Sequence, residues 1–352
     1  MSPGFKKSPK SRAGNGGAGG NLGAGGKSGT GGPKAPGGFK ASGNSKNFVG
    51  GKTYTDIGTG KKPKKRPPNT PFQRLVEIVK WVDLVIEVLD GRLPLSTRHP
   101  KSNEIFGGKP RLIIYSKLDM ADAKRLKEYV KRLNADHALA VRQAAENGGP
   151  RVVPMRAVAL CLKGRDNKAS FVESCLALTK DKRETLQKRG LLPRPMRAAV
   201  VGIPNVGKSS LINWFVGKKH ARTGDMPGVT KGNQWIRVHP QLELLDTPGI
   251  LPPTLFSQET MARLSVLNLV PPDTYDTLEA AQQSIRLMQK YYPQALDDYV
   301  PGLAEAQDGL IHIAEAKNFL ASGAKLDDLR AANILLRDIR DAKLGPLTLD
   351  EL

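Results

Sequence analysis

Apolar residues follow two alternating patterns between residue 72 and residue 246. Stretches with a helical period predict amphipathic helices, first in "FQRLVEIVKW" and then at about 121–134, 169–189 and 208–217. Short apolar runs predict six strands, at 84–89, 111–116, 151–157, 197–203, 234–239 and 242–246. This alternation is typical of an α/β fold, with a mostly parallel sheet and helices on both of its faces.

From about residue 256 the strand signals stop. Four helical stretches follow, separated by Pro or Gly: "MARLSVLNLV", "TLEAAQQSIRLMQKYY", "DGLIHIAEAKNFLASG" and "KLDDLRAANILLRDIRDAKLG". We therefore predict an α/β domain at 71–252 and an all-α domain at 253–352. A third segment, residues 1–70, precedes both.

Positive charge is concentrated in that first segment. The chain carries a formal charge of +22, and residues 1–70 hold 14 Lys and Arg against one acid, Asp56, a net +13. The segment is Gly-rich and too poor in apolar residues to offset its ordering entropy, so we expect a disordered basic arm. It would act as a nonspecific phosphate tether, as a solubilising tail or as an organelle transit peptide.

Composition excludes several classes of protein. The two cysteines, Cys161 and Cys175, cannot form a disulfide framework, and no cluster has the spacing of metal ligands. No apolar stretch approaches the ~18–20 residues that a membrane helix needs, so we expect a protein without a membrane span. The excess of positive charge points to a polyanionic partner, either nucleic acid or a membrane surface.

A phosphate-binding loop follows the strand predicted at 197–203. The spacing Gly202-x-x-x-x-Gly207-Lys208-Ser209 lets backbone N–H groups close around phosphates at a helix N-terminus. Lys208 would reach the terminal phosphates, and Ser209 would supply an oxygen to Mg²⁺. The alternative is a Gly-rich turn between a strand and a helix.

Two downstream segments fit the same chemistry. "LELLDTPG" places Asp246 at a strand end, where it would hold Mg²⁺ through water, and the Gly249 N–H would face the γ-phosphate. Between them, "TGDMPGVTKG" carries Thr230, which could close over Mg²⁺ as a nucleotide-dependent switch. We predict Lys208, Thr230, Asp246 and Gly249 as catalytic, with Ser209, Thr230 and Asp246 at the metal.

A loop for guanine follows the strand at 111–116. In "SKLD" the Asp119 carboxylate can accept from both N1–H and the exocyclic amine of guanine, a pair that adenine does not offer. The Lys117 stem would cover the ring, and "VVPMRA" would bring the Ala157 N–H to guanine O6. The predicted GTP-binding residues are Ser116, Lys117, Leu118, Asp119, Arg156, Ala157, Asn205, Val206, Gly207, Lys208, Ser209, Ser210 and Gly249.

The order of these motifs is rotated relative to a conventional GTPase, in which the phosphate loop comes first. Such a rotation is permissible because domain termini usually lie close together at the surface. It makes the segment after Asp246 run directly into the helical domain, so nucleotide state can bias that domain's position.

With these motifs in this order, the chain resembles circularly permuted GTPases of the ribosome-biogenesis GTPase A (YlqF) type. The resemblance runs from about residue 72 to the end, through "DGRLPLSTRHP", "SKLD", "GIPNVGKSS", "PGVTKG", "DTPGIL" and "LLRDIRDAKLG". It implies GTP hydrolysis stimulated by ribosomal particles in large-subunit assembly, contact of the C-terminal helices with ribosomal RNA, and K⁺ near Asn205. It further implies a cytoplasmic, ribosome-associated protein, with a plastid or mitochondrial location as the alternative. We expect a monomer.

The chain departs from that family at positions that matter for turnover. Ser116 stands where the family usually has an asparagine, and Arg156 stands where it often has a small polar residue. The segment "KKRPPNTPF" lacks the histidine of the family's Pro-Gly-His segment. Ile250 follows Gly249 where Ras-like enzymes use a glutamine. We therefore expect slow intrinsic turnover that depends on a partner, and the alternative is a GTP-gated RNA-binding scaffold with negligible turnover.

The last helix combines an apolar face with a basic one. Leu326, Leu329, Leu336 and Ile339 are expected to pack inward, because they share a face at 100° per residue. Three arginines gather beside that face and are candidates for RNA contact: Arg330, Arg337 and Arg340. The alternative is a solvated face with local ion pairs.

Overall fold

The computed structural model describes residues 70–164, 167–192, 194–217, 234–247, 249, 256–323 and 325–352. Residues 65–352 form one compact unit. The predicted arm and the predicted boundary between residues 252 and 253 lie outside the described residues, so the division into three domains stays a prediction. Within the described ranges, no helix is long and apolar enough to cross a membrane.

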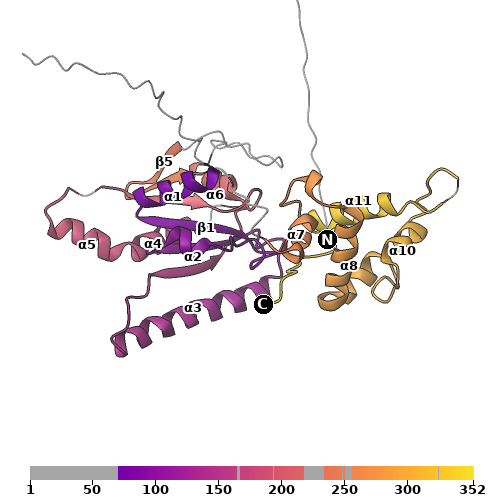
Figure 1. Cartoon of the computed structure of the whole chain (residues 1–352), viewed down its shortest axis with the longest axis horizontal. Coiled ribbons are helices and arrows are strands. Elements are labelled where there is room, and N and C mark those ends of the chain that lie inside the picture. Colours follow the sequence, from indigo (N-terminus) through magenta and orange to yellow (C-terminus); the bar gives the residue numbers. More distant parts are fainter. Residues whose placement is uncertain are drawn as a thin grey trace, which may run out of the picture. The chain divides into compact units, whose positions relative to one another are not determined.

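A six-stranded sheet organises the first half of this unit (Figure 1). In chain order its strands are β1 (Leu84–Asp90), β2 (Arg111–Ser116), β3 (Met155–Ala159), β4 (Met196–Val201), β5 (Gln234–His239) and β6 (Leu242–Asp246). Their order across the sheet is β3-β2-β1-β4-β6-β5, and only the β5–β6 pairing is antiparallel. The mostly parallel α/β fold is confirmed, and the strand predicted at 151–157 lies four residues later at its start.

Alternate strand residues face two different helical layers. Val85 and Val201 point towards α1 (Pro71–Trp81) and α2 (Ser102–Phe106). Ile113 and Tyr115 pack against α3 (Ala123–Glu146), whereas Val200 belongs to the core that contains residues of α4 and α6. The remaining helices here are α4 (Lys168–Leu178), α5 (Lys180–Lys188) and α6 (Lys208–Val216). Helices therefore cover both faces of the sheet, as predicted.

The second half is helical (Figure 1). It contains α7 (Gln258–Val266), a 3₁₀ turn at Pro272–Thr274, α8 (Thr277–Tyr291), α9 (Pro293–Tyr299), α10 (Gly309–Ala316) and α11 (Asp328–Arg340). Leu336 and Ile339 of α11 are buried, as expected, and Leu326 is half-buried ahead of the helix. The prediction for Leu329 is wrong: its side chain is half-exposed, because it lies in the first turn and the buried positions of α11 begin at Ala331.

The segment after α11 returns to the sheet half of the unit. The Leu347 N–H donates to the Met120 carbonyl at 3.1 Å, and the Leu349 N–H donates to the Arg92 carbonyl at 2.8 Å. Thr348 and Asp350 are fully buried. The sequence pattern did not predict this segment, which ties the C-terminal residues to two loops at the ends of β1 and β2.

Candidate nucleotide-binding site

The phosphate loop lies at the carboxyl end of β4, in the middle of the sheet, where parallel α/β folds bind their ligands. Gly202 has φ 152°, and a Cβ there would lie 2.4 Å from the Val88 carbonyl oxygen. Gly207, with φ 104°, directly precedes α6. Both glycines adopt a backbone that side chains disfavour, so the loop can close around an anion at the start of α6.

Lys208 lies inside this loop. Its ammonium donates to the Ile203 carbonyl at 2.7 Å. Burial lowers the pKa of Lys208 to about 8, and the nearby Asp246 carboxylate opposes that shift. A Cβ on Gly249 would lie 2.9 Å from Lys208 Nζ and from the Pro204 nitrogen, so the structure brings Gly249 against the phosphate loop.

Asp246 ends β6 beside the loop. Its side chain is almost fully buried, and Oδ1 has no hydrogen-bond partner among the described residues. Burial raises the pKa of Asp246, and Lys208 opposes this effect. A buried carboxylate oxygen without a partner fits a hard cation with oxygen ligands, so Asp246 is suited to hold Mg²⁺. Thr230 and Ile250 lie outside the described residues.

The base loop is joined to the phosphate loop through Ser116. The Ser116 side chain is fully buried at the end of β2, and Oγ lies 2.5 Å from the Val206 carbonyl oxygen and 3.0 Å from the Leu89 carbonyl oxygen. Ser116 therefore holds the two loops together, although it is shorter than the asparagine usual in the family.

A buried ion cluster fixes Lys117. Its backbone is left-handed at φ 56°, and Nζ lies 2.7 Å from Asp90 Oδ2. Arg92 forms two hydrogen bonds with the same fully buried carboxylate, from Nε at 3.1 Å and from Nη2 at 3.0 Å. Burial alone would raise the pKa of Asp90, but Arg92 and Lys117 hold it well below its usual range. The Asp90 carboxylate thus fixes the Lys117 side chain, although the sequence did not indicate this role for Asp90.

Asp119 lies at the mouth of the site and is about one-quarter exposed. Lys163 Nζ lies 2.7 Å from its Oδ2. The Leu118 N–H donates to the Leu160 carbonyl at 3.3 Å, so the base loop contacts the loop that follows β3.

The prediction for Arg156 and Ala157 is wrong. Both lie within β3 rather than at its end, and the Arg156 side chain is exposed. The Ala157 N–H donates to Asn134 Oδ1 at 2.8 Å, so it is not available to guanine O6. The cause is the apolar run at 151–154, which resembles a strand start although β3 begins only after Pro154.

The loop after β3, rather than Arg156 and Ala157, lies beside the base loop. Leu162 lies 3.9 Å from the position of a Cβ on Gly207, and the Gly164 carbonyl accepts from Trp214 Nε1 of α6 at 2.6 Å. Together with Lys163, these contacts place the loop beside both the base loop and the phosphate loop. Gly164, five residues past the end of β3, was the signal in the sequence that could have located it.

Asn205 connects the phosphate loop to the helical half. Its backbone has φ 62°, and Nδ2 donates to the Asn268 carbonyl just after α7 at 3.2 Å. Val206 is fully buried, whereas Ser209 is half-buried and Ser210 is exposed on the first turn of α6.

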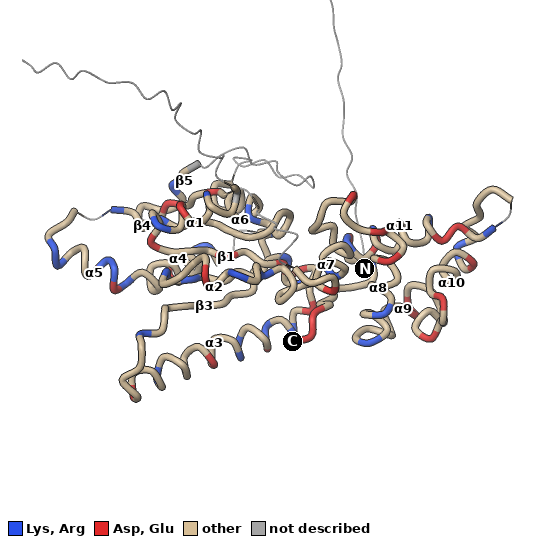
Figure 2. Tube along the Cα trace, in the orientation of Figure 1, with Lys and Arg blue, Asp and Glu red and all other residues tan. Residues whose placement is uncertain are grey.

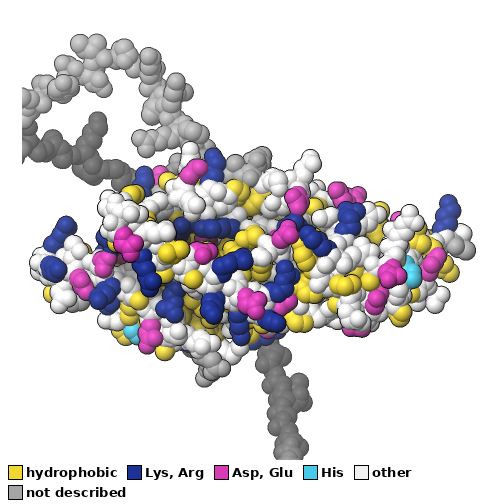
Figure 3. Space-filling model, turned by 90° about the horizontal axis from the view of Figure 1, so that it is seen from below, with side chains coloured by type: hydrophobic (Ala, Val, Ile, Leu, Met, Phe, Trp, Pro, Cys, Tyr) yellow, Lys and Arg dark blue, Asp and Glu magenta, His cyan; other side chains and the backbone are white. Residues whose placement is uncertain are grey.

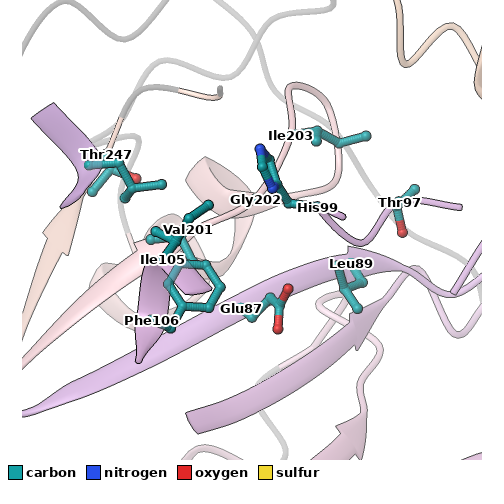
Figure 4. A pocket seen from close by; sticks show the side chains of 11 residues that line it. Glu87, Leu89, Thr97, His99, Ile105, Phe106, Val201, Gly202, Ile203 and Thr247 are labelled. Carbon is teal, nitrogen blue, oxygen red and sulfur yellow. The ribbon is translucent and has the colours of Figure 1, made fainter. Parts of the chain in front are cut away.

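Behind the phosphate loop lies a cavity of about 20 Å³, which has room for about one water molecule (Figure 4). Gly202 and Ile203 line it, together with Glu87 of β1 and His99. Glu87 Oε2 and His99 Nε2 are buried and have no hydrogen-bond partner in the part of the chain that the structure describes. His99 Nδ1 accepts from the Lys101 N–H at 3.0 Å, and burial lowers the pKa of His99. Two buried polar side chains therefore line the cavity beneath the loop.

Two of the three predicted RNA-contact arginines are exposed. Arg330 stacks over the Phe319 ring at 4.6 Å, and Arg337 keeps 63% of its side chain exposed. Arg340 does not share that surface, which corrects the predicted basic stripe. Its guanidinium donates to the Val266 and Ser265 carbonyls at 2.8 and 2.9 Å, so it caps the end of α7.

The comparisons with known proteins agree with this geometry. A family model described as "50S ribosome-binding GTPase" matches residues 197–321. Ribosome biogenesis GTPase A of Bacillus cereus is 35% identical over 282 residues, which cover 79% of this chain and 89% of that protein. The chain belongs to the ribosome biogenesis GTPase A family. The resemblance that the motifs indicated is therefore confirmed.

The chain is also similar to proteins from other organisms. Mitochondrial ribosome-associated GTPase 1 of Bos taurus is 29% identical over 304 residues, covering 79% of this chain and 85% of that protein. The crystal structure of GNP-bound YlqF from T. maritima overlaps with a TM-score of 0.49 at 21% identity, covering 79% of this chain and 97% of that one.

Proposed function

We propose that the protein binds and hydrolyses GTP during maturation of the large ribosomal subunit, and that the ribosomal particle stimulates the reaction. The observation that carries the proposal is the joining of three motifs at one edge of the sheet: Ser116 to Val206, and Gly249 to Lys208. Membership of a family named for ribosome biogenesis, and a matching model described as 50S ribosome-binding, support the choice of particle.

Each loop has a distinct task in this reaction. Protonated Lys208 and the backbone N–H groups that precede α6 bind the phosphates. Asp119 accepts from guanine N1–H and the exocyclic amine, while the Lys117 stem, fixed by Asp90, covers the ring. Ser209, Asp246 and Thr230 are the proposed holders of Mg²⁺, which when bound neutralises charge on the phosphates. K⁺ near Asn205 belongs to the same proposal.

Hydrolysis without a partner is expected to be slow. Ile250 follows Gly249 and cannot orient an attacking water, and the segment before α1 contains no histidine. A group supplied by a partner can raise the rate by as much as ~10⁵. Contact with the ribosomal particle would therefore determine when GTP is hydrolysed. We propose that the protein acts as a monomer on ribosomes in the cytoplasm, and the alternative compartment is an organelle.

The lack of a glutamine at position 250 and of a histidine before α1 also supports a second candidate, a GTP-gated RNA-binding scaffold with negligible turnover. Co-sedimentation with purified ribosomal subunits, with and without GTP, separates the readings when wild type is compared with Lys208→Ala. GTP-dependent pelleting that Lys208→Ala abolishes supports the proposed function once turnover is also detected. Pelleting without any turnover supports the scaffold. If wild type and Lys208→Ala pellet equally, with and without GTP, then GTP has no role in binding the particle.

A further inference from the structure

Helix α3 is 24 residues long and therefore about 36 Å from end to end. One side of it is anchored to the sheet: Leu126 is buried, Asn134 exchanges two hydrogen bonds with the Ala157 backbone, and His137 accepts from the Met155 N–H at 3.1 Å. These contacts lie in the first fifteen residues. The opposite side remains open to solvent along the whole helix.

That open side carries a row of cations, and Figure 2 marks the basic residues along α3. At 100° per residue, five basic residues fall within about 140° of one another, opposite Leu126. All five are exposed: Lys124, Lys127, Lys131, Arg132 and Arg142. We call this set the α3 basic face. Two acids, Glu128 and Glu146, share it and leave a net charge of +3. Figure 3 views the protein from this side and shows Lys and Arg side chains gathered there.

The cations of this face form no ion pair with an acid among the described residues, unlike two lysines of α5. There Lys182 pairs with Asp83, and Lys180 Nζ lies 3.8 Å from Glu184. On α3, Lys127 and Lys131 stand four residues apart, a spacing at which like charges destabilise a helix by about 0.2–0.5 kcal/mol. The face therefore keeps a net positive charge although two acids lie on it.

We propose that the α3 basic face binds the phosphate backbone of RNA, as a second contact surface on the GTPase half of the protein. The inference rests on the proposed function, in which the partner is a ribosomal particle. Lys124 and Arg142 lie about 27 Å apart along the axis, a straight row that suits a polyanion.

Other partners fit this face less well. Lysine is depleted in the cores of protein–protein interfaces, whereas three of the five cations here are lysines. A membrane surface would need a continuous free apolar face on the helix, whereas Leu126, Val130 and Leu133 of α3 pack against the sheet and the exposed apolar side chains are Leu139 and Val141 in its second half. Sequence-independent contact with phosphates, made by flexible cations, is the remaining match.

The test measures binding of the full-length chain to a structured RNA hairpin by fluorescence anisotropy over a range of salt concentrations. The test variant is Lys124→Gln/Lys127→Gln/Lys131→Gln. The matched control, Lys180→Gln/Lys188→Gln/Arg189→Gln, removes the same charge from exposed positions on and after α5. Because residues 1–70 are identical in all three proteins, their contribution to RNA binding cancels in the comparison.

We expect the α3 variant to bind at least about tenfold more weakly at 0.1 M salt, with the slope of log K against log salt shallower by about 2–3. The control should match wild type. Equal losses in both variants, or none in either, would overturn the proposal. Loss of particle binding with unchanged RNA affinity would mean a protein partner and would overturn it too. If the variant loses RNA affinity but wild type never pellets with ribosomal subunits, the surface stands and the proposed function fails.

Discussion

The Ser116 hydroxyl lies 2.5 Å from the Val206 carbonyl oxygen and joins two loops that are 90 residues apart in the chain. Its single proton can serve only one acceptor at a time, and Val206 is nearer than Leu89, whose carbonyl lies at 3.0 Å. The base loop and the phosphate loop are therefore connected directly. In this family member a serine makes the connection where the resemblance leads one to expect an asparagine.

Replacing Ser116 by alanine should loosen this connection. The buried Val206 carbonyl would lose its donor, which typically costs about 1–3 kcal/mol. We expect a lower free energy of unfolding and weaker binding of both GTP and GDP, measured by denaturant titration and by a fluorescent nucleotide. Ser210→Ala, which removes an exposed hydroxyl from the same part of the chain, is the control. Unchanged nucleotide affinity in Ser116→Ala would mean that the two loops act independently.

Asp119→Asn should relax or abolish the preference for guanine, because an amide cannot accept from N1–H and the exocyclic amine together. Competition of GTP with ATP for the site measures the preference. Lys163→Gln removes the cation 2.7 Å from Asp119 and leaves the carboxylate, so it should largely retain discrimination. A variant Asp119→Asn with full guanine preference would show that another group reads the base.

The pKa of Lys208 makes GTP binding depend on pH. Burial lowers this pKa to about 8, so above pH 8 the free protein loses the proton that the phosphates require. Binding there must take up a proton, and the dissociation constant should rise by up to about tenfold per pH unit, while it is nearly flat more than about one pH unit below 8. Calorimetry at pH 9 in two buffers of different ionisation enthalpy measures the uptake. Equal heats in both buffers would contradict it.

Asp350 anchors the segment after α11. Its fully buried carboxylate accepts from the Leu95 and Ser96 N–H groups at 2.7 and 2.8 Å, and from the Ser96 hydroxyl at 2.5 Å. Asp350→Asn would replace an acceptor oxygen by a donor and should cost about 2 kcal/mol or more. Glu351→Gln, at an exposed neighbouring position, should change little. Thermal unfolding of both variants decides whether the carboxylate holds this segment in place.

Features set by local rules could be predicted from the sequence. The phosphate loop follows from its spacing, and five of the six strands lie within two residues of the apolar runs. The remaining strand, β3, was placed too early because Val152 and Val153 belong to an apolar run that precedes Pro154. A proline removes a backbone donor and is rare inside a parallel ladder, which was the available warning.

Features set by tertiary contact could not be predicted. Nothing local shows that Asp90 holds Lys117, that Arg340 caps α7, or that Asp350 docks onto Ser96. Each contact joins residues that are distant in the chain or loops whose geometry depends on the sheet. The last helix shows the same division: its inward face was predicted, but Leu329 is half-exposed because the buried positions of the helix begin at Ala331.

The most direct test of the account is GTP turnover with and without purified precursors of the large ribosomal subunit, in potassium buffer. Lys208→Ala serves as the control that binds GTP poorly, and Arg330→Gln/Arg337→Gln tests whether the exposed arginines of α11 transmit the effect. We predict slow turnover alone and a rate at least about tenfold higher with particles, against a ceiling of ~10⁵ for groups supplied by a partner. Equal wild-type rates with and without particles would contradict the central claim.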